Sequence, residues 1–195
     1  IPDMDYPDEL LECIGAFPGY YLRYFYLNRA MIAKLKSSRY TRGEEVLKIE
    51  KRLLRMYKDP RLNKKPELLS KRGGAYYSKV ATFIIDSIVN NRGDTEIVNL
   101  PSAKKVVGFE PEEVLEIPAV INRKGATPLS NRVDNLHMFS LMRMIKGYER
   151  LTIEAAIERS FKKAVLALIT NPLILDGSLA IRLVKSINQR YKLGL

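Results

Sequence analysis

The chain has 195 residues, of which 46% are hydrophobic and 28% charged, and its formal net charge at pH 7 is +11. This balance is typical of a globular protein with a core, and 11 glycines and 10 prolines exclude a collagen-like or low-complexity chain. A single cysteine and a single histidine, far apart in sequence, exclude a disulfide framework and a Cys/His zinc site made by this chain alone. Because no apolar run approaches the roughly 18 residues of a membrane span and the opening is acidic, we expect a cytoplasmic protein without a membrane segment.

The pattern along the chain predicts many helices and a small sheet. In chain order, the expected helices cover residues 8–17, 42–58, 75–90, 133–147, 152–170 and 176–191. The other expected elements are strands at Glu96–Leu100 and Val114–Ile121, a basic loop at 60–71, and turns at 90–94 and 122–128. No linker or internal repeat divides the chain. We therefore expect one α+β domain over residues 1–195, rich in helix, with a small mixed or antiparallel sheet.

Local signals fix several of the expected helix ends. Thr41 and Glu44 have the spacing of a capping box, so a helix should begin directly after Thr41. An apolar stripe at helical spacing follows, made of Val46, Ile49, Leu53, Leu54 and Tyr57. Gly73-Gly74 is expected to open the 75–90 helix, and Thr152 to cap the 152–170 helix. The segment 20–26 holds five aromatic residues in seven positions and leaves helix or strand open.

The positive charge is concentrated in one segment. Residues 34–72 carry 14 basic side chains against 5 acidic ones, an excess of nine. Such a segment suits an anionic partner, which could be a nucleic acid, an anionic lipid or a phosphorylated small molecule. The alternative is a solvated helix face whose long side chains cover apolar surface.

Three features could carry chemistry. A tyrosine of the Tyr20–Tyr24 stretch can act as a base if a metal ion or an arginine lowers its pKa; otherwise the stretch is a packed aromatic cluster. Arg42 begins its helix, where the dipole disfavours a cation, which hints at a site role rather than a tolerated surface arginine. Arg72 beside Gly73-Gly74 could hold an anion, or the glycines could form a plain turn. Cys13 is interpreted as a small buried residue and His137 as a packing or surface residue, and neither is assigned a role.

Read in order, the motifs of this chain resemble those of one enzyme family. They are Gly15–Tyr26, Thr41–Glu44, Leu54–Asp59, Lys71–Ser78, Ile97–Asn99, Glu116–Pro118, Gly125–Pro128, Tyr148–Arg150 and Asn171–Leu173. Together they resemble the C-terminal domain of the family 4 glycoside hydrolases, and most of all its 6-phospho-β-glucosidases. Nothing in the chain matches the N-terminal Rossmann domain of that family. The resemblance therefore implies a C-terminal lobe, either excised or one half of a split enzyme.

The resemblance implies an NAD- and divalent-metal-dependent hydrolysis of 6-phospho-glycosides. In this scheme NAD⁺ oxidises the sugar C3 hydroxyl, a tyrosine removes the acidified C2 proton, and a metal, usually manganese, stabilises the intermediate. Elimination of the aglycone is followed by addition of water and reduction at C3. Tyr21 matches the base tyrosine, Arg42 matches an arginine near it, and Arg72 is assigned to the sugar phosphate or the wall of the site. The family's main NAD and metal ligands match no residues here, so we expect none in this chain.

Other functions stay open at this point. The lobe could be a structural or oligomerisation module without catalysis, or belong to an α-glycosidase of the same family, and we expect the isolated chain to be inactive. The basic 34–72 segment could bind nucleic acid, although no recognised nucleic-acid motif accompanies it. The expected partners are a phosphorylated sugar, a Rossmann domain in the same or a separate chain, and further copies of this chain in a homo-oligomer.

Overall fold

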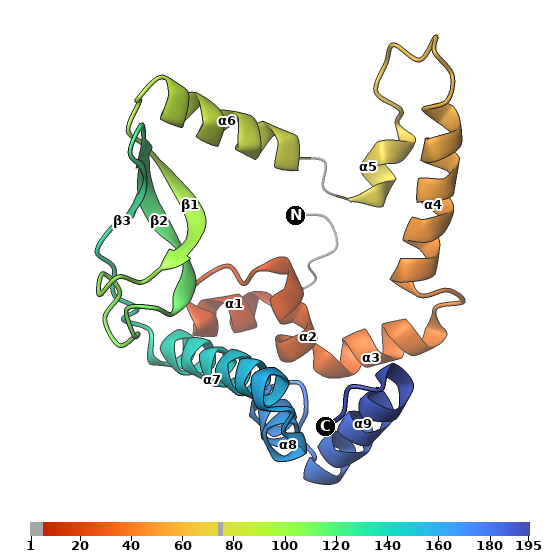
Figure 1. The fold of residues 1–195 in the computed structure, drawn as a ribbon, viewed down its shortest axis with the longest axis vertical. Helices are drawn as coiled ribbons and strands as arrows, with labels where there is room; N and C mark the ends of the chain where they lie inside the picture. The colour runs from red at the N-terminus through yellow and green to blue at the C-terminus, as the bar shows by residue number, and fades with distance from the viewer. Residues whose placement is uncertain (1–5, 74–75) are drawn as a thin grey trace. The chain divides into compact units, whose positions relative to one another are not determined.

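The computed structural model describes residues 6–73 and 76–195, which form a helix-rich α+β structure with a three-stranded sheet (Figure 1). These residues build two compact units. The first takes the described residues up to Met31, then Ser102–Glu113 and Ser130–Leu195; the second takes Ile32–Pro101 and Val114–Leu129. The chain passes from one unit to the other several times, so neither unit is a continuous stretch of sequence. Within the described ranges, no helix is both long enough and apolar enough to cross a bilayer.

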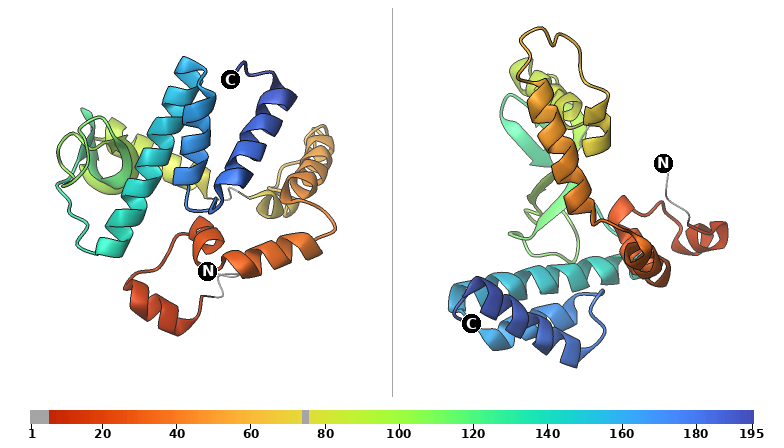
Figure 2. Two further views of the ribbon diagram at one scale, coloured as in Figure 1. Left: turned by 90° about the horizontal axis from the view of Figure 1, so that it is seen from below. Right: turned by 90° about the vertical axis from the view of Figure 1, so that its right-hand side faces the viewer.

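The first unit is built mainly from helices. They are α1 (Asp8–Ile14), the 3₁₀ turn η1 (Tyr20–Leu22), α2 (Arg23–Tyr26), α7 (Leu136–Glu158), α8 (Phe161–Thr170) and α9 (Gly177–Tyr191). Helix α7 packs against α8, and α8 packs against α9 (Figure 2). The buried side chains Ala155, Ala167 and Ala180 are small, so the three helices can approach closely. Helix α3 (Asn28–Ser37) begins in this unit and ends in the second.

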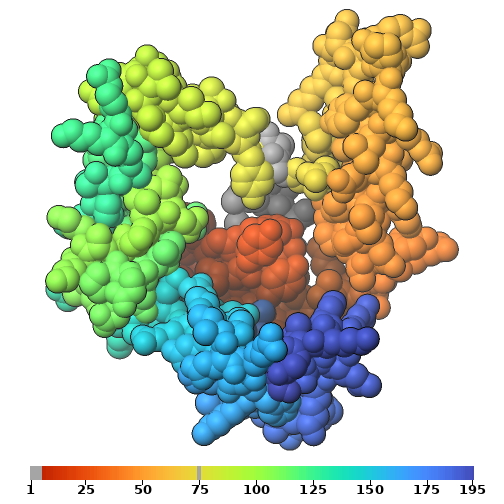
Figure 3. Space-filling model, in the orientation of Figure 1, coloured from red at the N-terminus to blue at the C-terminus, as the bar shows by residue number. Residues whose placement is uncertain are grey.

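The second unit contains the end of α3, further helices and the sheet. Its elements are α4 (Arg42–Met56), α5 (Leu68–Arg72), α6 (Tyr77–Val89), β1 (Asp94–Pro101), β2 (Val114–Asn122) and β3 (Gly125–Pro128). The strands pair antiparallel in the order β1-β2-β3. Alternate residues of β2 are buried, namely Leu115, Ile117, Ala119 and Ile121, as expected of a strand with one face in the core. Helix α6 packs on β2, and α5 packs against α4, the yellow and orange segments of Figure 3.

The capping box predicted from the sequence is confirmed. The Glu44 N–H donates to the Thr41 hydroxyl oxygen at 3.2 Å, and the Thr41 N–H donates to the Glu44 carboxylate at 2.7 Å. This hydrogen bond from the Thr41 backbone lowers the pKa of Glu44. Of the predicted apolar stripe on α4, Leu53 is buried, whereas Leu54 and Tyr57 are exposed.

The predicted division between the helices 133–147 and 152–170 is wrong. Helix α7 runs without a break from Leu136 to Glu158. Thr152 lies inside it, and its hydroxyl donates to the Tyr148 carbonyl at 2.8 Å instead of capping a helix. The break falls at Arg159, which has a left-handed φ of 51°, and Ser160 caps α8 by accepting a hydrogen bond from the Lys163 N–H.

Several shorter elements also differ from the prediction. The expected turn at 122–128 is a hairpin, because residues 125–128 pair with β2 as strand β3. The expected basic loop at 60–71 contains most of the short helix α5. Gly73 follows α5 and α6 begins at Tyr77, so Gly73 does not open a helix; Gly74 lies outside the described residues. The first helix ends at Ile14 rather than residue 17, because Gly15 adopts a left-handed φ of 67°.

Candidate functional site

The aromatic segment, Tyr20–Tyr26, is helical and lies in the first unit. It forms η1 and α2 in succession, which settles the choice between helix and strand. Pro18 just before the segment is buried, and its ring restricts the backbone where the chain enters the turn. The side chain of Tyr21 is 78% exposed. Its phenol is therefore accessible to a molecule bound against this unit.

Arg23 forms a stack with two tyrosines of this segment, Tyr20 and Tyr24. Its guanidinium carbon lies 3.8 Å from the ring centre of Tyr20 and 5.2 Å from that of Tyr24, within the range of cation–π attraction. The Tyr20 ring meets the Tyr21 ring edge-on, with 5.5 Å between their centres. Burial lowers the pKa of Arg23, but its hydrogen bond to Tyr24 and its proximity to both phenols raise that pKa overall. A permanent positive charge therefore covers the ring that contacts Tyr21.

Two buried polar atoms beside this stack have no hydrogen-bond partner among the described residues. They are the Tyr6 hydroxyl and the Arg23 Nε. Burial raises the pKa of the Tyr6 phenol, Tyr26 raises it further, and Arg23 lowers it in part. Both unpartnered groups can donate a hydrogen bond, and an unsatisfied buried donor is costly. The first unit therefore holds two buried donors whose hydrogen-bonding capacity is unused by the described residues.

Helix α7 anchors the aromatic segment. The Tyr26 hydroxyl lies 2.9 Å from His137 Nε2 at the start of α7, and Phe25 stacks on the same imidazole with ring centres 6.5 Å apart. Burial raises the pKa of Tyr26. Asn135 caps α7 and donates to the Ile14 carbonyl at 2.9 Å, which ties α1 to the same helix end. His137 is thus an exposed packing residue, in agreement with its interpretation from the sequence.

Arg42 and Arg72, both in the second unit, are brought together by the structure. Arg42 is the first residue of α4, and its Nη2 donates to the backbone carbonyl of Lys71 at 2.8 Å and to that of Arg72 at 3.4 Å. Its Nη1 also lies 3.5 Å from the Glu45 carboxylate. The guanidinium thus binds the C-terminal end of α5, where carbonyl oxygens carry partial negative charge.

Arg72 is the last residue of α5 and is only loosely paired. Its Nη2 lies 3.8 Å from the Glu50 carboxylate on α4, a long distance for an ion pair, and both side chains are close to half exposed. A more highly charged anion could displace this carboxylate. Because Arg72 ends a helix, the predicted anion site at a helix start is not formed by Arg72 and Gly73. An anion bound at the end of α5 would therefore be held by the Arg72 side chain and not by the backbone N–H groups of a helix start.

The described residues offer no metal site. No three His, Cys, Asp or Glu side chains in ranges 6–73 and 76–195 are grouped so that they could hold an ion. Cys13 is exposed on α1, which corrects its interpretation as a small buried residue. The end of a two-turn helix at the surface does not require an apolar side chain at that position.

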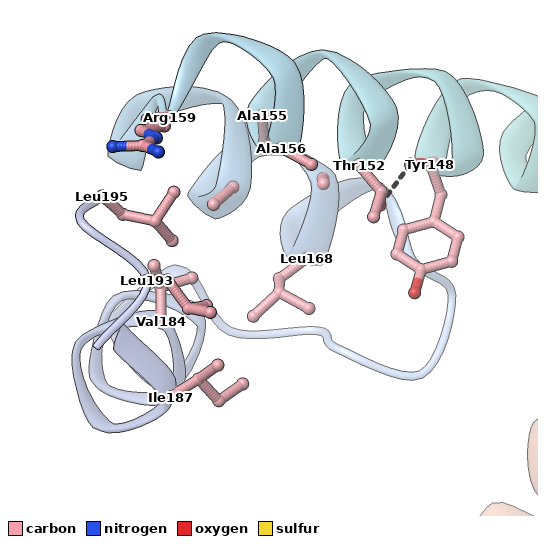
Figure 4. Close-up of a pocket in the computed structure, with 12 residues that line it drawn as sticks. Tyr148, Thr152, Ala155, Ala156, Arg159, Leu168, Val184, Ile187, Leu193 and Leu195 are labelled. Atoms are coloured by element: carbon pink, nitrogen blue, oxygen red, sulfur yellow. Dashed lines mark hydrogen bonds between the residues drawn. The ribbon is translucent and has the colours of Figure 1, made fainter. Parts of the chain in front are cut away.

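A separate apolar pocket lies between α7, α8 and α9 in the first unit. Its volume is about 330 Å³, and its walls include Ala155, Leu168 and Val184 (Figure 4). Arg159 and Leu195 lie at one end of it and Tyr148 at the other. None of the three predicted site residues lines this pocket. It is therefore distinct from the candidate site.

Arg23 and Tyr6 are the site residues that sequence reasoning missed. A signal for Arg23 exists, because a cation three residues after Tyr20 reaches that ring once the segment is helical. Tyr6 has no comparable signal. It is separated from the aromatic segment by α1 and reaches Tyr26, edge-on with 6.2 Å between ring centres, through tertiary packing.

Comparison with known proteins gives a consistent result over the whole chain. The chain is 35% identical to 6-phospho-beta-glucosidase BglT of Thermotoga maritima, over 100% of its own length and 47% of that protein. It is 31% identical to a probable 6-phospho-beta-glucosidase of Bacillus subtilis, over 98% of this chain and 44% of the relative. It therefore spans a little under half the length of these relatives.

Solved structures give the same result. The 6-phospho-beta glucosidase from Thermotoga maritima, solved with NAD and glucose-6-phosphate, superposes with a TM-score of 0.84 at 32% identity, over 97% of this chain and 46% of that one. A 6-phospho-alpha-glucosidase from gut microorganisms, 21% identical with a TM-score of 0.78, shares the fold. The sequence model of one protein family, described as the family 4 glycosyl hydrolase C-terminal domain, matches residues 3–174 of the chain. The chain therefore belongs to the family 4 glycosyl hydrolases and carries their C-terminal domain.

Proposed function

We propose that this chain is the C-terminal lobe of a cytoplasmic 6-phospho-β-glucosidase that depends on NAD and a divalent metal such as manganese. The observation that carries the proposal is the likeness to 6-phospho-beta-glucosidases along the whole chain. Residues 1–195 would serve as the substrate-binding and oligomerisation domain. The other half of the enzyme would be a Rossmann domain in the same or a separate chain, and the assembled protein a homo-oligomer.

Tyr21 is the proposed base. Its oxygen would take the proton from C2 of the sugar, and its exposure supports the proposal because a base has to reach the atom it deprotonates. Since the described residues form no metal site, no step of this proposal passes through a metal held by this chain.

Arg42 and Arg72 are the proposed substrate-binding residues. A sugar phosphate is a dianion, and a guanidinium can bind two of its oxygens at once. The loose pairing of Arg72 with Glu50 supports this role, because a phosphate competes well with a distant carboxylate. The segment 34–72, with its nine excess positive charges, would also draw an anionic substrate toward the second unit.

The base role is tested by Tyr21→Phe in the complete enzyme, which comprises this lobe and its Rossmann domain. We expect turnover of p-nitrophenyl 6-phospho-β-glucoside, with NAD⁺ and Mn²⁺ present, to fall by about 10²–10⁴-fold, because a general base is lost. Exchange of the C2 proton with deuterated water should fall in parallel, while glucose 6-phosphate still binds.

Tyr191→Phe is the matched control, since Tyr191 is exposed on α9 and has no proposed role. It should keep full turnover. If Tyr21→Phe keeps both turnover and C2 exchange within a few-fold of the unmodified enzyme, another group is the base.

A further inference from the structure

The apolar pocket between α7, α8 and α9 has no part in the proposed reaction. Its volume of about 330 Å³ is about twice that of the roughly 150 Å³ cavity that holds one benzene molecule. Its walls are mostly aliphatic, and the two small residues Ala155 and Ala167 among them are buried (Figure 4). Atoms that line an open space lack dispersion contacts on that side, which an apolar molecule would supply. The pocket therefore has room for a molecule with an apolar body larger than one ring.

Arg159 places a positive charge at one end of this pocket (Figure 4). The residue follows the last turn of α7 in a left-handed conformation, with φ 51°. Glycine is the usual residue at such a helix end, because a side chain is strained there. A cation in the preceding helical turn would complement the helix dipole without that strain. The position of this arginine therefore indicates a use for its side chain beyond the helix end.

The guanidinium of Arg159 is available to a ligand. Within residues 6–73 and 76–195, it has no partner in a hydrogen bond or an ion pair. The residue is exposed, and a methyl group added at Gly194 would lie 3.9 Å from its Nη1, so the guanidinium lies beside the segment 193–195. Leu193 and Leu195 of that segment line the pocket. The charge therefore lies where the apolar walls meet solvent.

The segment 193–195 is held against α9 by one side chain. Asn188 donates to the Leu195 carbonyl at 3.0 Å and accepts a hydrogen bond from the Leu195 N–H at 3.1 Å. Gly194 allows the chain to fold back, since its φ is 71°. This wall of the pocket is thus formed without a ligand, which lowers the entropy cost of binding one.

We propose that this pocket binds a small amphipathic carboxylate, with its apolar body between α7, α8 and α9 and its carboxylate on Arg159. A guanidinium can donate two parallel hydrogen bonds to a carboxylate, and a single negative charge matches the single unpaired cation. At the other end, the Tyr148 hydroxyl can bind a polar substituent of the apolar body (Figure 4). The proposal does not rest on the glycosidase reaction, because Tyr21, Arg42 and Arg72 do not line the pocket.

The test is calorimetric titration of the complete enzyme with 4-phenylbutanoate. We expect a Kd on the order of 0.1 mM for a ligand of this size. The neutral 4-phenylbutanamide, which has the same apolar body, should bind about fivefold more weakly. Arg159→Gln should raise the Kd of the carboxylate about fivefold and leave that of the amide unchanged, because only the carboxylate pairs with the guanidinium. Arg182→Gln, at an exposed position of α9 outside the pocket, is the matched control and should change neither Kd.

A second variant fills the pocket and leaves its charge unchanged. Ala156 lines the pocket and is exposed, so Ala156→Leu adds bulk there without overpacking a buried position. This variant should raise the Kd of the carboxylate and that of the amide alike, by about tenfold. Glucose 6-phosphate should not displace either probe, since its proposed site is elsewhere.

These titrations measure heat, so they remain informative if the complete enzyme does not turn over phosphorylated β-glucosides. Binding that neither Arg159→Gln nor Ala156→Leu weakens, or displacement by glucose 6-phosphate, would place the probe at another site and overturn the proposal. No binding at about 10 mM 4-phenylbutanoate would also overturn it, and would indicate that another part of the enzyme fills the pocket.

Discussion

Ser87 is fully buried, although most of α6 is exposed and the side chain is polar. Its hydroxyl donates to the Ile121 carbonyl of β2 at 2.7 Å and accepts a hydrogen bond from the Asp94 N–H at 3.4 Å. One side chain therefore joins α6 to two strands of the sheet. A buried hydroxyl is tolerated here because its hydrogen-bonding capacity is used.

Ser87→Ala should destabilise the fold by about 1–3 kcal/mol, because the Ile121 carbonyl and the Asp94 N–H each lose a partner. Urea unfolding followed by circular dichroism would measure the change. Ser78→Ala, at an exposed position of the same helix, is the matched control and should change stability by less than about 0.5 kcal/mol. Equal effects of the two variants would show that the Ser87 hydrogen bonds make no net contribution to the free energy of unfolding.

Single residues also show how far sequence reasoning can go. The helix dipole argument indicates a site role for Arg42, and that role stays a prediction. The argument could not identify the contact that Arg42 makes with α5, because the acceptor is a backbone carbonyl 29 residues away and every residue has one. The resemblance selects Tyr21 among neighbouring tyrosines, and its role as the base stays a prediction. The stack with Arg23 follows from a helical backbone that the aromatic pattern left open.

At the scale of elements, a charged cluster joins α7 to α8. Lys163 on α8 donates to Glu154 at 2.7 Å and to Glu158 at 2.5 Å, both on α7, while Arg150 donates to Glu154 at 3.2 Å. The hydrogen bond from Lys163 lowers the pKa of Glu154, and Arg150 lowers it further. The hydrogen bond to Glu154, followed by that to Glu158, raises the pKa of Lys163.

This cluster makes the α7–α8 junction dependent on pH. A carboxyl whose pKa is lowered by folding stabilises the protein above its unfolded pKa, near 4.5, and that contribution is lost as the pH falls through the folded value. Lys163→Gln should therefore lower the melting temperature at pH 7, and the difference from the unmodified chain should shrink below about pH 4. Lys162→Gln, an exposed neighbour, is the control. A difference that stays constant from pH 7 to pH 3 would contradict this role.

The elements themselves could be predicted where local chemistry was decisive. The capping box placed the start of α4 correctly, and the strands expected at Glu96–Leu100 and Val114–Ile121 lie within two residues of the observed ends of β1 and β2. The break between α7 and α8 could not be predicted, since Thr152 and Ser160 are both suitable caps and the observed turn uses Arg159 rather than a glycine. The strand β3 could not be predicted either, because it has only four residues and its extended conformation depends on pairing with β2.

At the scale of the whole molecule, the chain spans a little under half the length of its relatives. The proposed reaction needs NAD and metal ligands that the resemblance places in the other half. The 195-residue chain alone should therefore not turn over 6-phospho-β-glucosides with NAD⁺ and Mn²⁺ present, and addition of the Rossmann domain should restore turnover. The measurement is release of p-nitrophenol over time. Turnover by the chain alone, at a rate proportional to its concentration, would refute the assignment as a dependent lobe.

The interleaving of the two units affects how the chain is made. During synthesis the second unit has all of its segments once Leu129 has emerged. Helices α1 and α2 are made before α7, whose end holds them through Asn135 and His137. Domains generally fold as units while the ribosome is still adding residues. A nascent chain that pauses before Leu136 therefore leaves the tyrosines of the aromatic segment without the contacts that α7 makes with them.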